Sequence, residues 1–491
     1  MLLTEDGPHK RRFTYQIMKT ATIAAVATPP GIGGVGIIKI SGPEALKIAA
    51  TLFRSRKNDN NTRKADRGDF LSTNFQSHRL YYGHIVDPET ENHADEVLLA
   101  VMRAPRSYTR EDVIEIQAHG GAAALSVILE LVLRQGARIA EPGEFTQRAF
   151  MNGRIDLTQA EAVIDVINAK TETALKIATN QVSGQLKLAV ENIRSILLDV
   201  LVHIEAAIDF PEDVSEILTV NDLEAKLQRE VAVPIVDLMR RYREGCIYRD
   251  GLKLAIVGRP NVGKSSLLNC LLKRQRAIVN PLPGTTRDLV EDSFQVQGVP
   301  VTITDTAGLH EAEDPVEKIG IQKARECLKT ADLILQVIDG SEEITVDDHA
   351  IFRFCCDKPH IVVVNKIDLV VGQKTVAPLV PVNWDVPLTV EVSALTGDGI
   401  DDLKGCIADA VALKTEDVQH DTVIPNLRHQ QALEKCHQNV LSAINALEEN
   451  RTIELVALDI QEAVGRFDQI LGLSVDTDIF EQIFSRFCIG K

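Results

Sequence analysis

Residues 252–266 read LKLAIVGRPNVGKSS, and this stretch decides the fold of the central part of the chain. The apolar run at 252–257 is typical of a strand buried on both faces, and a helical pattern follows it. Between them, Gly258 to Ser265 have the spacing Gly-x4-Gly-Lys-Ser, which surrounds phosphates with backbone N–H groups at a helix N-terminus. Lys264 would reach the β and γ phosphates, and Ser265 would ligate Mg²⁺. The stretch therefore predicts a strand, a phosphate-binding loop and a helix.

Two later segments supply groups expected around the γ-phosphate and the metal ion. The sequence Asp305-Thr306-Ala307-Gly308 follows the apolar run VTIT, so Asp305 would stand at a strand end near the metal. The Gly308 amide could then approach the γ-phosphate. Thr286, in the sequence GTTRD, is the expected second hydroxyl ligand of Mg²⁺.

Base recognition is predicted from two further strand ends. Asn365-Lys366-Ile367-Asp368 follows the run IVVV, and the Asp368 carboxylate can accept hydrogen bonds from guanine N1 and from its exocyclic amino group. Adenine offers no such pair of donors, so it would leave a buried carboxylate unsatisfied. Ser393-Ala394 follows LTVEV, where a backbone amide can meet the guanine oxygen. Together the motifs predict a GTP-binding domain. The residues expected to contact GTP from these motifs are Asn261, Val262, Gly263, Lys264, Ser265, Ser266, Thr286, Asp305, Thr306, Ala307, Gly308, Asn365, Lys366, Asp368, Ser393 and Ala394.

The group that orients the attacking water is not the usual one. Ras-like GTPases use a glutamine two residues after the Ala of this motif, but the chain has Leu309 there, and an apolar side chain cannot orient water. The acidic residues between 311 and 317 are candidates for the role. In the phosphate loop, the Asn261 carboxamide could help to hold a hard cation whose charge replaces that of an arginine finger.

The sequence on either side of this domain has a different pattern of apolar residues. Residues 21–154 mix short strand-like runs with a helical pattern at Ala122 to Arg134, which indicates an α+β domain. Helical spacing fills 155–250 and returns in 409–491. Five buried-strand runs within 251–408 predict a mainly parallel sheet. We therefore expect a multidomain α/β and α protein, with an α/β domain inserted into a discontinuous helical domain and an extension at 1–20.

Composition excludes several classes of protein. The 491 residues are 45% hydrophobic and carry 70 acidic against 53 basic side chains, a formal net charge of −17, which is typical of a globular chain. A chain this acidic repels polyanions at long range, so a nucleic-acid partner needs a local basic patch or a helper protein. No apolar run approaches the roughly 18 residues of a membrane span. Eight scattered cysteines and no secretory signal favour a reducing compartment, the cytoplasm.

Several long strings make the chain resemble the MnmE, or TrmE, family of tRNA-modification GTPases. The strings are ATPPGIGGVGIIKISG (27–42), SYTREDVIEIQAHGG (107–121), EPGEFTQRAFMNGRIDL (141–157), EAAIDFPE (205–212), GRPNVGKSSLLN (258–269) with GTTRD (284–288), and the terminal FCIGK (487–491). The resemblance runs from about Thr20 to Lys491. It implies an N-terminal folate-binding domain that dimerises, a helical domain made of two segments, and the inserted GTPase domain.

The resemblance also implies an activity and partners. Members act as homodimers with an FAD-binding partner, MnmG, in a heterotetramer that adds an aminomethyl or carboxymethylaminomethyl group to C5 of the tRNA wobble uridine. The one-carbon unit comes from 5,10-methylene- or 5-formyl-tetrahydrofolate. K⁺ promotes hydrolysis and pairing of GTPase domains. By resemblance its ligands are Asn261, Asn280, Leu282 and Thr285, with Asn280 and Thr285 also near GTP, and Glu317 matches the water-orienting glutamate.

The folate positions carry over as Lys39, Glu115, Arg154 and Lys491. Lys39 replaces an arginine of relatives and Arg154 replaces a lysine, so charge is kept while hydrogen-bond geometry changes. Cations suit the glutamate carboxylates of a folate, and a carboxylate suits the N–H donors of its pterin. By resemblance Cys488 lies near the folate, where a thiolate helped by basic neighbours could act as a nucleophile.

Two other functions share part of this pattern. A ribosome-assembly or RNA-chaperone GTPase would have the same nucleotide site and act as a binding switch, but no RNA-binding fold with a basic face is evident. A folate-dependent transferase acting on a small molecule would need no GTPase domain. Titration with a reduced folate tests the first alternative, and a wobble-base nucleoside profile tests both.

Overall fold

The computed structural model describes residues 21–55, 75–209, 220–273, 292–305, 330–355, 358–370, 384, 388–412, 423–474 and 477–491. These residues form two compact units. The N-terminal unit contains the described residues up to Ile164 and those from Leu471 onward. The central unit contains the described residues from Asp165 to Ile470. In the described part of the chain, no helix is both long enough and apolar enough to span a membrane.

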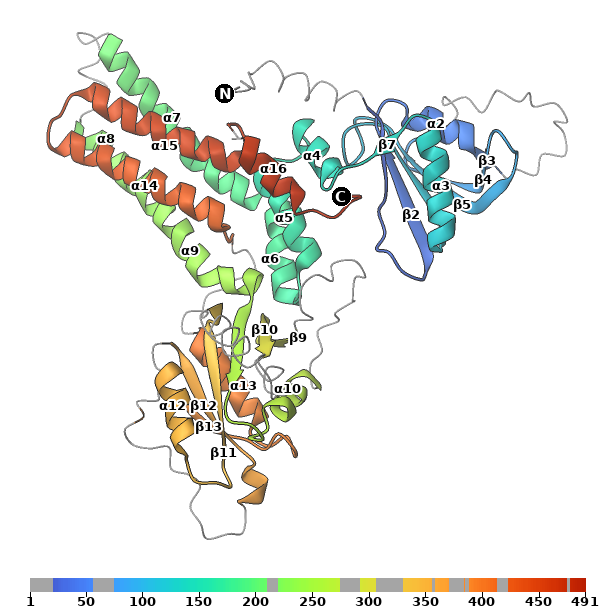
Figure 1. The fold of residues 1–491 in the computed structure, drawn as a ribbon. Helices are drawn as coiled ribbons and strands as arrows, with labels where there is room; N and C mark the ends of the chain where they lie inside the picture. Colours follow the sequence, from blue (N-terminus) through green and yellow to red (C-terminus); the bar gives the residue numbers. More distant parts are fainter. Residues whose placement is uncertain are drawn as a thin grey trace, which may run out of the picture. The chain divides into compact units, whose positions relative to one another are not determined.

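The N-terminal unit is built on a seven-stranded sheet in the order β3-β4-β5-β6-β2-β1-β7, covered by two helices (Figure 1). The pairings are antiparallel except for β1 with β7. The strands are β1 (Ile23–Val26), β2 (Gly33–Ser41), β3 (Phe53–Ser55), β4 (Arg79–Val86), β5 (His93–Met102), β6 (Val113–Gly120) and β7 (Arg138–Ile139), and the helices are α2 (Ala45–Leu52) and α3 (Ala122–Arg134).

Alternation along these strands separates a buried face from an open one. Ile38 and Ile40 of β2 are fully buried in a core with Ile114 and Ile116 of β6 and with residues of α2 and α3. Lys39 between them points to the other face, which is open at β4 and β5 but covered near β1 and β2 by Tyr108 and Phe145. The predicted α+β domain is confirmed, and α3 has the bounds that the apolar spacing predicts.

The C-terminal segment packs within the N-terminal unit. Helices α4 (Glu144–Met151), the start of α5 (Leu157–Asn168) and α16 (Thr477–Ser485) share an apolar cluster that includes Phe480, Phe484 and Phe487. Beyond α16, the Phe145 amide donates to the carbonyl of Lys491 at 3.2 Å. These contacts hold the last residue of the chain against α4.

Long helices form one part of the central unit. They are α6 (Glu172–Val182), α7 (Gln185–Asp209), α8 (Val220–Lys226), the π-helical turn η2 (Leu227–Ala232), α9 (Val233–Asp250), α14 (Leu427–Glu448) and α15 (Ile453–Leu471). In Figure 1, helices that precede residue 251, such as α7, lie alongside helices that follow residue 423, such as α15. Arg194 of α7 pairs with Asp468 of α15 at 2.6 Å. The predicted helical domain of two chain segments is thus confirmed as an architecture.

The other part of the central unit is a six-stranded sheet in the order β13-β12-β11-β8-β10-β9. All pairings are parallel except β9 with β10. Its elements are β8 (Leu252–Val257), α10 (Lys264–Lys273), β9 (Asp292–Val296), β10 (Val299–Asp305), β11 (Leu333–Asp339), α12 (Val346–Cys355), β12 (His360–Asn365), β13 (Thr389–Glu391) and α13 (Ile400–Ala412). The five predicted strands are confirmed; the antiparallel edge strand β9 was not predicted, because it is short and not continuously apolar.

Candidate functional site

The phosphate loop joins β8 to α10, as its sequence predicts. Gly258 and Gly263 have φ values of 154° and 96°, in the region that favours glycine. A Cβ on Gly258 would lie 2.3 Å from the carbonyl oxygen of Val337, and one on Gly263 would lie 2.2 Å from Nδ2 of Asn365. The two glycines therefore allow the loop to pack directly against β11 and β12. Asn261 between them is also left-handed, with φ of 65°.

Lys264 and Ser265 open α10 at the edge of this loop. The Lys264 ammonium donates to the carbonyls of Gly258 at 2.9 Å and Arg259 at 2.7 Å, so the side chain lies over the loop. Ser265 and Ser266 are exposed, whereas Val262 is buried beneath them. The first helical turn thus presents hydroxyls and backbone N–H groups at the loop, an arrangement suited to phosphate oxygens and a hydrated Mg²⁺.

Asn365 connects the phosphate loop to the predicted base-binding loops. It is the last residue of β12 and is 1% exposed. Its Nδ2 donates to the carbonyl of Val262 at 2.8 Å, and its Oδ1 accepts from the Ala394 amide at 3.0 Å. Ser393 beside it donates to the Asp368 carboxylate at 2.5 Å. One buried amide therefore connects the phosphate loop with two strand-end segments that lie more than a hundred residues further along the chain.

Lys366 and Asp339 form a second link at these strand ends. Lys366 has a left-handed backbone, with φ of 66°, and its ammonium lies 2.5 Å from Oδ2 of Asp339. Burial would raise the pKa of Asp339, but hydrogen bonds from Lys366 and Ser341 hold it below its usual value. The carboxylate is therefore ionised at neutral pH and orients the lysine.

Part of the predicted nucleotide site lies outside the described residues: Asn280, Leu282, Thr285, Thr286, Thr306, Ala307, Gly308 and Glu317. Asp305 is described as backbone only. It is the last residue of β10 and is paired with Ile256 of β8, two residues before the phosphate loop begins. This register agrees with the predicted placement of Asp305 beside the loop.

The structure adds a residue pair that the motifs do not reveal. The Nε atom of Arg259, in the phosphate loop, lies 2.9 Å from Oδ2 of Asp348, whose side chain is 2% exposed. Asp348 also accepts from the amide and hydroxyl of Thr345, 2.9 and 2.8 Å away, just before α12. The spacing Thr-x-x-Asp at a helix start is a capping signal that could have drawn attention to this carboxylate.

The four predicted folate positions all lie in the N-terminal unit. Lys39 and Glu115 stand opposite each other on β2 and β6. The ammonium of Lys39 lies 4.6 Å from the ring centre of Tyr108 and 5.0 Å from that of Phe145. Arg154 places its guanidinium carbon 4.7 Å from the same Tyr108 ring and donates to the Tyr108 carbonyl at 2.9 Å. Two cations therefore share one aromatic ring.

Burial and two neighbouring cations act in the same direction on the pKa of Lys39. Its pKa is lowered to about 8: burial is the main cause, Glu115 opposes the lowering, and Lys491 and Arg154 add to it. The other three folate positions therefore all act electrostatically on Lys39. Cys488 is exposed, and its carbonyl accepts from the Lys491 amide at 3.3 Å.

Tyr108 and Phe145 are the members of this cluster that the sequence analysis did not single out. Both lie within strings that carry the family resemblance. Their role becomes visible only when β2 and α4 bring Lys39 onto their rings. A buried ion network holds α4 in place: Glu144 accepts from Arg138 and Arg148, and Arg148 also contacts Glu111 at 3.0 Å.

Comparison with known proteins identifies the family of this chain. The family model described as the MnmE helical domain matches residues 157–488, and the one described as the GTP-binding protein TrmE N-terminus matches residues 22–154. A tRNA modification GTPase MnmE from Thermoanaerobacter pseudethanolicus is 43% identical over 476 residues, covering 96% of this chain and 99% of that one. The protein of the same name from Syntrophus aciditrophicus is 45% identical over 470 residues, covering 96% and 99%. With a family model matched over more than half of its length and relatives aligned over nearly their whole length, the chain belongs to the MnmE (TrmE) family of tRNA modification GTPases.

Proposed function

We propose that this chain binds and hydrolyses GTP and acts as the folate-binding subunit of the complex that modifies the tRNA wobble uridine. The observation that carries the GTP assignment is the Asn365 amide, which joins the phosphate loop to the loop of Ser393 and Ala394. The tRNA assignment rests on the name shared by relatives that align with nearly the whole chain.

In this proposal the phosphate loop holds the nucleotide and its metal ions. Lys264 binds the β and γ phosphates, and Ser265 with Thr286 ligates Mg²⁺. K⁺, held by Asn261 and the segment that contains Asn280, Leu282 and Thr285, offsets the charge that develops during hydrolysis. Glu317 orients the water in place of the missing glutamine.

The N-terminal unit would bind the one-carbon donor, 5,10-methylene- or 5-formyl-tetrahydrofolate. The support is chemical: Lys39, Arg154 and Lys491 supply cations for the glutamate tail, and Glu115 can accept from the pterin N–H groups. Tyr108 and Phe145 add apolar ring surface beside Lys39. Cys488 is exposed in the C-terminal segment and is proposed as a nucleophile at this site.

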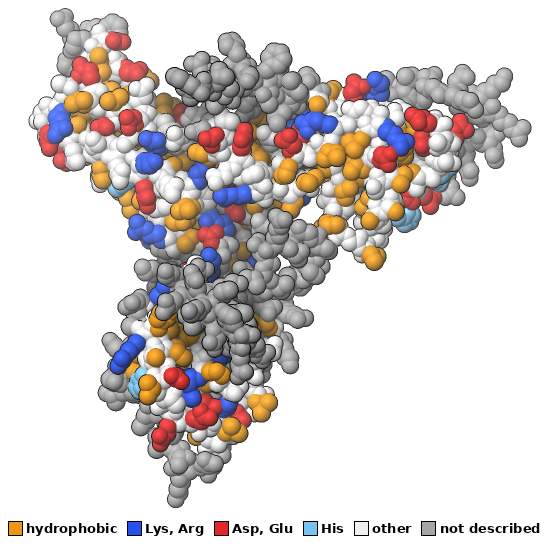
Figure 2. Space-filling view, in the orientation of Figure 1, with side chains coloured by type: hydrophobic (Ala, Val, Ile, Leu, Met, Phe, Trp, Pro, Cys, Tyr) orange, Lys and Arg blue, Asp and Glu red, His pale blue; other side chains and the backbone are white. Residues whose placement is uncertain are grey.

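The open face of the N-terminal sheet offers a surface for a second copy of the chain. Tyr82 lies opposite Leu98, and Leu80 lies opposite Ala100. Leu80, Tyr82 and Leu98 are 60%, 46% and 39% exposed, which is unusual for neighbouring apolar residues of a sheet. Figure 2 shows hydrophobic side chains gathered at the surface of this unit. We propose homodimerisation through the N-terminal domain and association of the dimer with the FAD-binding MnmG subunit, in the cytoplasm.

The wobble-base nucleoside profile of a strain that lacks this gene tests the proposal. We expect the aminomethyl-type modification at C5 to disappear and to return with the wild-type gene. An unchanged profile would contradict the proposed function. Hydrolysis by the purified protein in KCl and in NaCl tests the cation separately, since equal rates in both salts would remove K⁺ from the mechanism.

A further inference from the structure

The β9–β10 hairpin joins the two segments expected to sense the γ-phosphate. β9 begins at Asp292, six residues after Thr286, and β10 ends at Asp305, the first residue of the DTAG sequence. The strands are paired along their length, from Val296 with Val299 to Asp292 with Ile303. A shift of either strand along its axis therefore moves the turn at Gln297–Gly298.

That turn contacts Thr171, the N-cap residue of helix α6. The Thr171 hydroxyl donates to the Gly298 carbonyl at 2.8 Å and accepts from the Ala174 amide at 3.1 Å. The same hydroxyl thus caps α6 and binds the hairpin, and Thr171 is only 6% exposed. A Cβ on Gly298 would lie 2.4 Å from the Thr173 hydroxyl oxygen, so the turn is tightly fitted.

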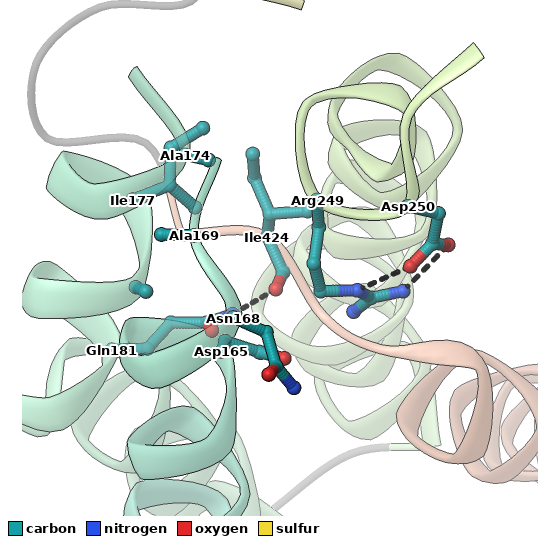
Figure 3. A pocket seen from close by; sticks show the side chains of 10 residues that line it. Asp165, Asn168, Ala169, Ala174, Ile177, Gln181, Arg249, Asp250 and Ile424 are labelled. Atoms are coloured by element: carbon teal, nitrogen blue, oxygen red, sulfur yellow. Dashed lines mark hydrogen bonds and ion pairs between the residues drawn. The ribbon is translucent and has the colours of Figure 1, made fainter. Parts of the chain in front are cut away.

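Beside α6 lies a cavity of about 180 Å³ (Figure 3). Its lining includes Ala174 and Ala178 of α6, Arg249 and Asp250 at the end of α9, and Ile424. Asp250 directly precedes Gly251 and β8, where the chain enters the GTPase sheet, and Ile424 lies just before α14, where it returns to the helices. α6 therefore faces both connections of the inserted domain.

Apolar and polar contacts both line this cavity, and Ile177 of α6 belongs to the same buried apolar cluster as Ile424. The Gln181 amide of α6 donates to the Ile424 carbonyl, and Arg249 pairs with Asp250 at 2.8 Å, as Figure 3 shows. Protein interiors are normally close-packed, and a space of this size beside small alanine side chains leaves α6 room to move. The hairpin contact is at one end of the helix and this space is along its side.

From this arrangement we infer that Thr171 is a positioning residue that transmits the nucleotide state of the GTPase domain, through the β9–β10 turn, to α6 and the helical domain. The inference rests on the proposed GTP binding. It requires a two-state element whose equilibrium the nucleotide biases, and α6 beside its cavity is that element.

Hydrogen exchange in the full-length protein tests the inference. The Ala174 and Leu175 amides, bonded to Thr171, report the first turn of α6. We expect their exchange rates to differ about fivefold or more between GDP and a GDP–aluminium fluoride complex in KCl. If the protein binds both nucleotides but these amides exchange at equal rates in the two states, the inference is wrong and the proposed function is unaffected. A failure to bind either nucleotide would overturn the proposed function as well.

Two variants separate the hairpin contact from the helix cap. Thr171→Asp keeps a capping oxygen but cannot donate to the Gly298 carbonyl, so the difference in exchange between nucleotides should fall below about twofold. Thr171→Ser keeps both bonds and should behave as wild type. Nucleotide affinity should stay unchanged in both.

The matched control is Thr179→Val on the same helix, where the hydroxyl bonds only within α6, to the Leu175 carbonyl at 2.7 Å. It should keep the response to nucleotide. A Thr171→Asp protein that keeps the response, or a Thr179→Val protein that loses it equally, would contradict the assignment. The wild-type comparison remains decisive if a variant does not fold.

Discussion

The phosphate-binding site of the central unit and the cation cluster of the N-terminal unit are held together in different ways. Around the phosphate loop, glycines, backbone carbonyls and one buried amide define the geometry. Around Lys39, two cations from distant parts of the sequence meet on aromatic rings, and Glu115 and Lys491 act electrostatically on Lys39. Backbone geometry is nearly independent of pH, whereas the side-chain cluster depends on the charge of each member. The two sites should therefore respond differently to substitution and to pH.

The largest effect is expected from Lys264→Ala. This change removes the ammonium that lies over the phosphate loop and is proposed to bind the β and γ phosphates, so it should lower GTP hydrolysis about a hundredfold or more. Lys253→Ala is the matched control, because Lys253 is exposed on the preceding strand. Hydrolysis by Lys264→Ala at the control rate would contradict the proposed phosphate-binding role of Lys264.

Asp368→Asn should alter base selectivity instead of phosphate binding. Losing a charged acceptor for two guanine donors should weaken GTP binding about tenfold to a hundredfold and favour xanthine nucleotides. Competition between the two nucleotides measures the change. Unaltered GTP selectivity would count against the assignment of Asp368, and equal loss of both nucleotides would indicate general damage.

Lys39→Met should weaken binding of a reduced folate about fivefold to tenfold and remove its pH dependence. Because the pKa of Lys39 is lowered to about 8, its charge is lost as pH rises from 7 to 9, so wild-type affinity should fall over that interval. Calorimetric titration at several pH values measures both effects. The exposed Lys47 of α2 supplies the control, Lys47→Met, which should titrate as wild type.

The smallest effect is expected from Arg138→Gln at the network that holds α4. Burial would raise the pKa of Glu144, but hydrogen bonds led by that from Arg138 hold it below its usual value. The pair therefore stabilises the fold above the unfolded pKa of Glu144, and this contribution is lost as pH falls through the lower folded value. We expect Arg138→Gln to lower the free energy of unfolding by about 1 kcal/mol at pH 7, measured by denaturant titration. The difference should shrink on acidification; a constant difference would contradict this account.

Local sequence patterns explain which elements and site residues could be predicted. The five parallel strands were found because strands buried on both faces are continuously apolar, and α3 because its spacing is regular over thirteen residues. β9 was missed because an edge strand needs no such run. At the nucleotide site, the phosphate loop, Asp305, Asn365 and Ser393 each lie at the end of a recognisable strand, whereas Thr286 was predicted from its motif alone. The Arg259–Asp348 pair was missed because its partners come from a loop and a helix start with no pattern in common.

The sequence by itself determined the phosphate loop, the order of the nucleotide motifs and the alternation of helical and α/β segments. Local spacing is sufficient for these, since a glycine's backbone freedom and the period of a strand or helix depend on near neighbours. Only the tertiary structure decided that Lys39, Arg154 and Tyr108 form one cluster, that the C-terminus returns to α4, and that Thr171 meets Gly298. Such contacts depend on long-range packing, which brings together residues whose separation along the chain carries no periodic signal.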